Sequence, residues 1–83
     1  MHKMNSVYLV YKTDRQHTYA SRDLIGIATT KAISVRICKE QAKKEGESIT
    51  EEQLFNLNNI KQTQGYSGSG EFQFEELSTN ILL

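Results

Sequence analysis

The sequence predicts an α+β fold with two layers, a three-stranded, mostly antiparallel sheet and two helices packed on one face of it. Three observations carry this prediction. Two early segments are rich in β-branched and aromatic residues, two middle segments have helical periodicity with start signals, and a late segment alternates apolar and polar residues. The order ββααβ lets both layers bury their apolar sides. Since the chain has 83 residues, we expect one domain spanning residues 1–83.

The first two segments have the composition of strands. Residues 6–12 alternate between two largely apolar faces, which favours a central strand. One face carries Val7, Leu9 and Tyr11, and the other carries Tyr8 and Val10. Residues 24–29 predict a second strand with Ile25 and Ile27 on one face. Gly26 between them indicates either close packing of another side chain or a β-bulge.

Two helices are expected next, and each has a start signal. Thr29 or Thr30 can cap a first helix that runs to about Glu45, with Gly46 as its left-handed stop. Thr50 and Gln53 have the spacing of a capping box that starts a second helix, which ends near residue 61. The apolar arc of the first helix comprises Ile33, Val35, Ile37, Cys38 and Ala42.

The end of the chain combines a polar segment with a strand. Residues 62–70 are polar and glycine-rich, so they are expected to form a flexible loop. In residues 71–77 the alternation places Phe72 and Phe74 inward and Glu71 outward. Residues 1–5 are expected to be a frayed N-terminus.

Composition limits the classes of function. Ten basic and ten acidic residues cancel, so no global field attracts nucleic acid or a membrane surface. Cys38 is the one cysteine, which excludes an internal disulfide and suits a reducing compartment. No apolar run has transmembrane length, and the start does not resemble a secretion signal. These features predict a protein of the cytoplasm, without a membrane partner.

No catalytic, metal or cofactor site is expected. One polar connection contains the residue types of a hydrolytic triad, but triads normally converge from separate segments that fix each side chain. These residues are Asp14, His17, Ser21 and Asp23. No paired metal-ligand motif is present, and the glycines of residues 65–70 lack the spacing of a phosphate loop. The sequence therefore favours a binding protein without enzymatic activity.

Candidate contact residues fall into three groups. For a protein partner they are Arg15, His17, Tyr19 and Arg22 in the first polar connection and Tyr66 in the second. A basic stripe of Arg36, Lys39 and Lys43, together with the tyrosines, suits single-stranded nucleic acid as the alternative. The apolar tail Ile81, Leu82 and Leu83 suits a partner or the pairing of two copies into a homodimer.

Four segments together resemble short uncharacterised bacteriophage and prophage proteins. They are residues 7–11 (VYLVY), 21–26 (SRDLIG), 63–65 (TQG) and 75–83 (EELSTNILL). The resemblance implies a context in which small neutral proteins block host machinery, as anti-CRISPR proteins and other inhibitors of host defence do. It implies a non-enzymatic inhibitor that contacts a host protein or ribonucleoprotein complex inside the host cell. A single-stranded RNA-binding module and a phage structural or assembly protein are the alternatives.

Overall fold

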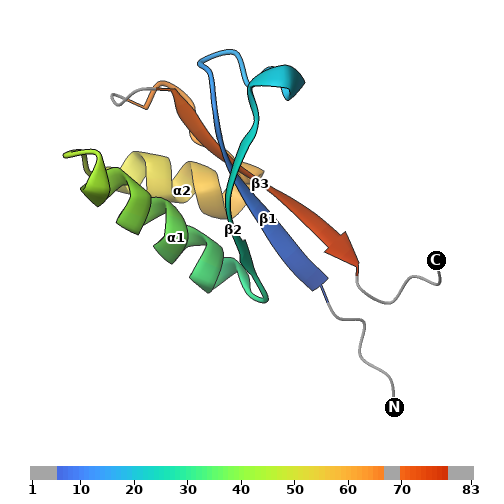
Figure 1. Cartoon of the computed structure of the whole chain (residues 1–83). Helices are drawn as coiled ribbons and strands as arrows, with labels where there is room; N and C mark the ends of the chain where they lie inside the picture. The colour runs from blue at the N-terminus through green and yellow to red at the C-terminus, as the bar shows by residue number, and fades with distance from the viewer. Residues whose placement is uncertain (1–5, 67–69, 79–83) are drawn as a thin grey trace.

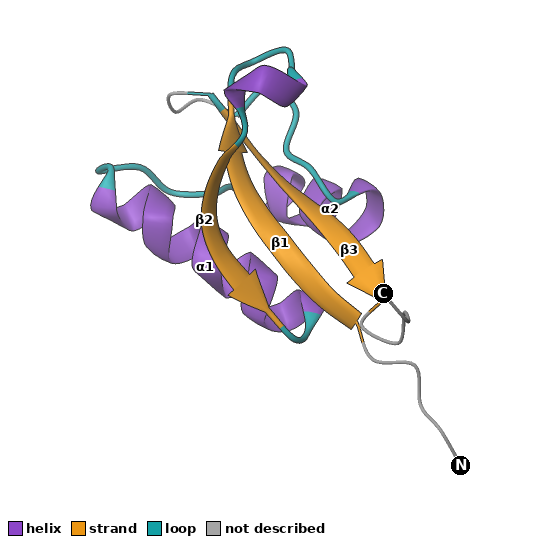
Figure 2. Cartoon of the chain, turned by 45° about the vertical axis from the view of Figure 1, so that its right-hand side comes forward, coloured by secondary structure: helices purple, strands orange, loops and turns teal. Residues whose placement is uncertain are grey.

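The computed structural model, which describes residues 6–66 and 70–78, confirms the two-layer ββααβ fold. Its elements are β1 (Ser6–Thr13), the short 3-10 helix η1 (Tyr19–Ser21), β2 (Asp23–Ala28), α1 (Lys31–Lys44), α2 (Glu51–Ile60) and β3 (Glu71–Ser78). The strands pair antiparallel in the order β2-β1-β3, so β1 is central as expected. Both helices lie on the same side of the sheet (Figure 1). In Figure 2 the sheet stands in front of α1 and α2, and the face that it turns to the viewer is the one that these two helices do not cover.

The core lies between the sheet and the helices. Val10 of β1 and Phe72 and Phe74 of β3 are almost fully buried on the helix side, which confirms the inward direction predicted for the two phenylalanines. They pack in one cluster with Cys38 of α1 and Leu57 of α2. Burial of these apolar surfaces supplies the main stabilisation of the fold.

A β-bulge in β2 changes the expected alternation of that strand. The pairing register shifts after Val10, so that Gly26 is opposite Val10 whereas Leu24 is opposite the next residue of β1. Ile25 is the extra residue and packs against the core, while Ile27 is 60% exposed. The expectation that these two isoleucines share a face is therefore wrong, since a bulge shifts the alternation by one residue.

Gly26 also permits close packing of α1 on β2. A Cβ atom at this position would lie 2.9 Å from Cδ1 of Ile37. Both alternatives expected for this glycine, a bulge and close packing, are thus present together.

The helix signals are largely confirmed. The Thr30 hydroxyl accepts a hydrogen bond from the Ile33 amide at 3.1 Å, and Thr50 accepts one from the Gln53 amide at 3.3 Å. Gly46 follows α1 with a left-handed φ of 75°. The reciprocal half of the capping box is not formed. The Gln53 side chain instead donates to the carbonyl oxygen of Gln64 and accepts from its amide at 2.9 Å.

The segment after α2 is packed rather than loose. Thr63 and Tyr66 are buried, and Gln62 forms a β-bridge with Gln73. The prediction of a flexible loop is therefore wrong for residues 62–66, because the amides of Gln64, Gly65 and Tyr66 find hydrogen-bond partners inside the protein. Residues 67–69 of the predicted loop and the predicted frayed residues 1–5 lie outside the described residues.

Candidate functional site

The face of the sheet opposite the helices carries a group of exposed apolar side chains. Because Val10 and Phe74 point toward the helices, their neighbours along each strand point to the other side. In register, Leu9 is opposite Ile27 and Val7 is opposite Leu77. We call this side of the sheet, which faces the viewer in Figure 2, the open face. By the strand register its apolar members are Val7, Leu9, Tyr11, Leu24, Ile27 and Leu77.

Exposure on the open face is high for apolar side chains. Ile27 is 60% exposed, Leu24 is 50% exposed and Leu77 is 41% exposed. Single exposed apolar residues are ordinary, but a contiguous group on one surface is typical of a site of contact with another macromolecule.

A cluster of charged and aromatic groups adjoins these apolar residues. The guanidinium of Arg22 lies 4.8 Å from the ring centre of Tyr19 and 5.1 Å from that of Tyr11. Its Nη1 is 3.7 Å from Oε1 of Glu75, which also accepts a long hydrogen bond of 3.4 Å from the Tyr11 hydroxyl. Burial and the neighbouring Glu75 carboxylate raise the pKa of Tyr11. Tyr19, with 80% of its surface exposed, is the outermost member of the cluster.

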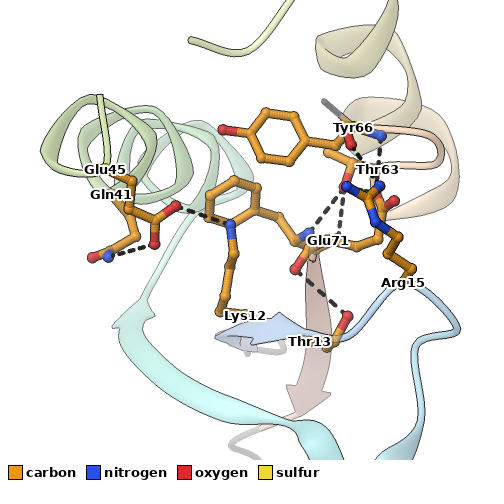
Figure 3. A network of polar contacts seen from close by, with 9 residues as sticks. Lys12, Thr13, Arg15, Gln41, Glu45, Thr63, Tyr66 and Glu71 are labelled. Atoms are coloured by element: carbon orange, nitrogen blue, oxygen red, sulfur yellow. Dashed lines mark hydrogen bonds and ion pairs between the residues drawn. The ribbon is translucent and has the colours of Figure 1, made fainter. Parts of the chain in front are cut away.

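The two polar connections meet at one end of the molecule. His17 Nε2 is 2.9 Å from the Thr63 carbonyl oxygen, and His17 Nδ1 is 3.0 Å from Oε1 of Gln73. Arg15 donates from Nη1 to the Tyr66 carbonyl oxygen at 3.1 Å (Figure 3). These contacts join the β1–β2 connection to the segment that precedes β3, so both connections contribute to one surface.

A buried carboxylate holds the second connection in place. Glu71 is 2% exposed, and its carboxylate accepts from the Thr63 hydroxyl at 2.6 Å and from the amides of Gly65 at 3.1 Å and Tyr66 at 3.3 Å. Figure 3 shows Glu71 and Thr63 within this network. The outward, solvated position predicted for Glu71 is wrong. The alternation of β3 does direct it away from the helices, but residues 63–66 cover it.

Lys12 occupies the helix side of the same end. Its ammonium group is 4.1 Å from the ring centre of Phe72 and 3.0 Å from Oε1 of Glu45 (Figure 3). Burial alone would raise the pKa of Glu45, but hydrogen bonds from Gln41 and Lys12 lower it overall. The Lys12 side chain therefore links β1 to the end of α1 and serves to hold these two elements together.

The residues predicted to bind a partner differ in how far their side chains are exposed to solvent. Tyr19 is exposed, Arg22 is partly exposed on the open face, and Arg15 lies at the end where the connections meet. His17 is half-buried between the two connections. Tyr66, predicted as a partner contact in a flexible loop, is 1% exposed, so its ring is not available on the surface of the described structure. Its ring packs on Phe72 with 5.3 Å between the ring centres.

The residues predicted for nucleic-acid contact are separated by the sheet. Arg36, Lys39 and Lys43 are exposed on α1, behind the sheet, whereas Tyr11 and Tyr19 lie with the open face. Tyr8 is on the helix side, where it packs against Phe74. Ile81, Leu82 and Leu83, predicted as a contact or dimer surface, lie outside the described residues.

The residue types of a hydrolytic triad have structural partners in the β1–β2 connection. Asp14 accepts from the amide and hydroxyl of Thr18 and from the amide of Gln16, and these hydrogen bonds lower its pKa. Ser21 accepts from the Asp14 amide and donates to the Thr18 carbonyl. The His17 ring bonds to Thr63 and Gln73 instead. The carboxylate, imidazole and hydroxyl are thus not arranged as a catalytic relay.

Within residues 6–66 and 70–78, no three His, Cys, Asp or Glu side chains gather as a metal site. Burial raises the pKa of the Cys38 thiol to about 12, which makes it a poor nucleophile at neutral pH. None of the helices among these residues has both the length and the apolar character needed to cross a bilayer.

Comparison with known proteins finds no matching family model, no matching curated protein and no matching solved structure.

Sequence reasoning did not identify Leu24, Ile27 and Leu77 as candidate site residues. One signal was available, because residues 6–12 are apolar on both faces while two helices on one side cover only one of them. The sequence therefore contained an apolar surface with no element of the predicted fold to bury it.

Proposed function

We propose that this chain is a non-enzymatic binding protein of the phage type, which inhibits a host macromolecular machine by direct contact through its open face. The observation that supports the proposal is the run of exposed apolar side chains on that face, with Ile27 at 60% exposure opposite Leu9 of the central strand. Burial of such a surface against a partner lowers the free energy of the complex, because apolar atoms are removed from water.

The surroundings of the apolar group are also suited to a protein partner. Aromatic and arginine side chains are enriched where protein interfaces gain most of their binding energy. Tyr19 and Arg22 lie beside the apolar group and add such contacts to it. The apolar residues of the open face lie on paired strands that pack against the helices, an arrangement that limits the ordering entropy lost on binding.

The alternative, a single-stranded RNA-binding module, receives less support from the geometry. Such modules combine aromatic rings and cations in one groove, so that bases stack while phosphates are neutralised. Here the basic stripe Arg36, Lys39 and Lys43 is on α1, away from the aromatic rings of the open face. A protein partner therefore fits the open face better than a nucleic acid does.

The experiment is affinity capture of the tagged full chain from a bacterial host lysate, with and without nuclease, followed by mass spectrometry. Ile27→Lys is the test variant because it places a charge in the open face. Phe55→Lys is the matched control, since Phe55 of α2 is an exposed apolar residue of similar exposure, 65%, on the helix layer. Circular dichroism establishes that both variants fold.

The wild type and Phe55→Lys are expected to recover the same protein complex after nuclease treatment, and Ile27→Lys is expected to lose it. Equal recovery by all three proteins would exclude the open face as the contact surface. Recovery that disappears with nuclease would replace the protein partner by RNA.

A further inference from the structure

The guanidinium of Arg22 lies in a site that could bind an anion, but no acceptor there satisfies its hydrogen-bond donors fully. A guanidinium carries five N–H donors in a planar fork that matches a carboxylate with two parallel hydrogen bonds. Among the described residues, the Nε atom of Arg22 is buried and has no hydrogen-bond partner. Leaving a buried donor of this kind unpaired costs free energy that an added acceptor recovers.

The acid already beside Arg22 does not fill this role. The distance of 3.7 Å from Nη1 to Oε1 of Glu75 exceeds the about 2.7–2.9 Å of a charge-assisted hydrogen bond. Glu75 is also shared with the Tyr11 hydroxyl. The ion pair therefore holds the guanidinium near the sheet without satisfying its donors.

Two rings fix the guanidinium in position. Tyr11 and Tyr19 lie 5.1 Å and 4.8 Å from it, distances at which a cation is attracted to the face of a ring. Tyr19 is 80% exposed, so it is the member of the cluster that an incoming group meets first. The side chain of Arg22 is 20% exposed and already faces solvent in part.

We infer that Arg22 is the receptor for a carboxylate side chain of the protein partner, which docks beside the apolar residues of the open face. This inference rests on the proposed function and adds the partner's chemistry, an acidic residue flanked by apolar ones. A nucleic-acid backbone fits the site less well, because the basic residues of α1 are on the other layer and cannot contact neighbouring phosphates. One guanidinium is enough to bind a single carboxylate, whereas binding of a nucleic-acid backbone requires several cations along its length.

The test uses the full-length chain and follows the arginine Nε–H signals by NMR during titration with small probes. The probes are acetyl-Leu-Glu-Leu-amide, the same peptide with Gln in place of Glu, and a short oligothymidylate. The acidic peptide is expected to shift the Arg22 signal saturably and to bind roughly tenfold more tightly than the Gln peptide, as for hydrogen bonds to a charged group. The Arg36 signal on α1 is the internal control and is expected to stay in place.

Two variants sharpen the result. Arg22→Gln is expected to remove the difference between the two peptides, and Glu75→Gln is expected to tighten binding of the acidic peptide because it removes the competing carboxylate. Equal binding of both peptides to the wild type would overturn the inference. A larger Arg22 shift with oligothymidylate than with the acidic peptide would also overturn it, in favour of a phosphate ligand.

The affinity capture described above separates this inference from the proposed function. If Arg22→Gln retains the captured complex while Ile27→Lys loses it, the carboxylate receptor is wrong and the open face remains the contact surface. Loss of the complex with both variants supports the receptor.

Discussion

The imidazole of His17 reaches the carbonyl oxygen of Thr63 across 2.9 Å and thereby joins two connections that are 46 residues apart in sequence. Since a carbonyl only accepts, Nε2 must donate this hydrogen bond. His17 holds this position with a left-handed φ of 57°, a conformation unfavourable for a residue with a side chain. The ring contacts compensate for that cost and fix the end of the sheet next to Arg22 and Tyr19.

Replacement of His17 separates the stabilisation by its ring hydrogen bonds from the cost of its left-handed backbone. His17→Ala is expected to destabilise the protein by about 1–2 kcal/mol, because the ring hydrogen bonds are lost while the left-handed backbone remains. His17→Gly loses the same bonds but relieves the backbone, so it is expected to be about 1 kcal/mol more stable than His17→Ala. Urea unfolding measures both values, with Gln16→Ala at the exposed neighbouring position as the control. Equal stability of the Ala and Gly variants would contradict the left-handed strain.

Glu71 is expected to be the least replaceable acidic residue among those described. Glu71→Gln places an amide NH2 where an oxygen now faces the donors of Thr63, Gly65 and Tyr66. The loss is expected to be at least about 2 kcal/mol, because buried donors are left without an acceptor. Hydrogen exchange should show faster exchange of the Gly65 and Tyr66 amides. Glu52→Gln, on the exposed side of α2, is the control and should leave both properties unchanged. Unchanged exchange in Glu71→Gln would refute the anchoring role.

Gly26 and Ile37 should be energetically coupled. Gly26→Ala is expected to cost about 1–3 kcal/mol, because the added methyl would lie 2.9 Å from Cδ1 of Ile37. Ile37→Val removes that atom, so the same glycine substitution should cost clearly less in a protein that already carries Ile37→Val. A double-mutant cycle of unfolding free energies measures the coupling. If the cost of Gly26→Ala is the same in both backgrounds, close packing is not the reason for the glycine.

The buried thiol of Cys38 is expected to make the free energy of unfolding depend on pH in the alkaline range. Burial raises its pKa from 9.0 to about 12 in the folded protein, so unfolding at high pH releases a proton. The stability contributed by the protonated thiol is complete below pH 9.0 and is lost as the pH rises toward about 12. Between pH 8 and 10 this group should lower the free energy of unfolding by about 1 kcal/mol.

Cys38→Ala isolates this effect from the titration of lysines and tyrosines. The variant is less stable overall because it leaves a cavity, but its stability should fall less steeply over the same pH interval. Parallel pH profiles of the two proteins would show that the thiol does not contribute.

Local signals predicted the elements of the fold because each signal acts over a few residues. The Thr30 and Thr50 caps, the left-handed Gly46 and the alternation of Phe72 and Phe74 all have causes within one turn or strand. The order of the elements then left few ways to bury their apolar sides.

The predictions that were wrong depend on contacts between distant segments. Alternation correctly directs Glu71 away from the helices, but it cannot show that the amides of Gly65 and Tyr66 cover the carboxylate. Composition likewise made residues 62–66 resemble a loose loop, although the side chains of Gln53 and Glu71 bind the backbone of this segment.

The candidate site was only half predicted for the same reason. Tyr19 and Arg22 were predicted as contact residues because polar connections often carry exposed aromatic and basic groups, and the structure places both beside the open face. Ile27 was not recognised, because its exposure depends on the bulge at Ile25 and on the placement of both helices behind the sheet.

The most direct test of the open face as the contact surface is covalent side-chain labelling of the free protein and of its captured complex, read by mass spectrometry. Labelling of Tyr19, Leu24, Ile27 and Leu77 is expected to fall in the complex, while labelling of Phe55 on α2 is expected to stay unchanged. Protection of Phe55 with continued labelling of Ile27 would contradict this expectation and would move the contact surface to the helix layer.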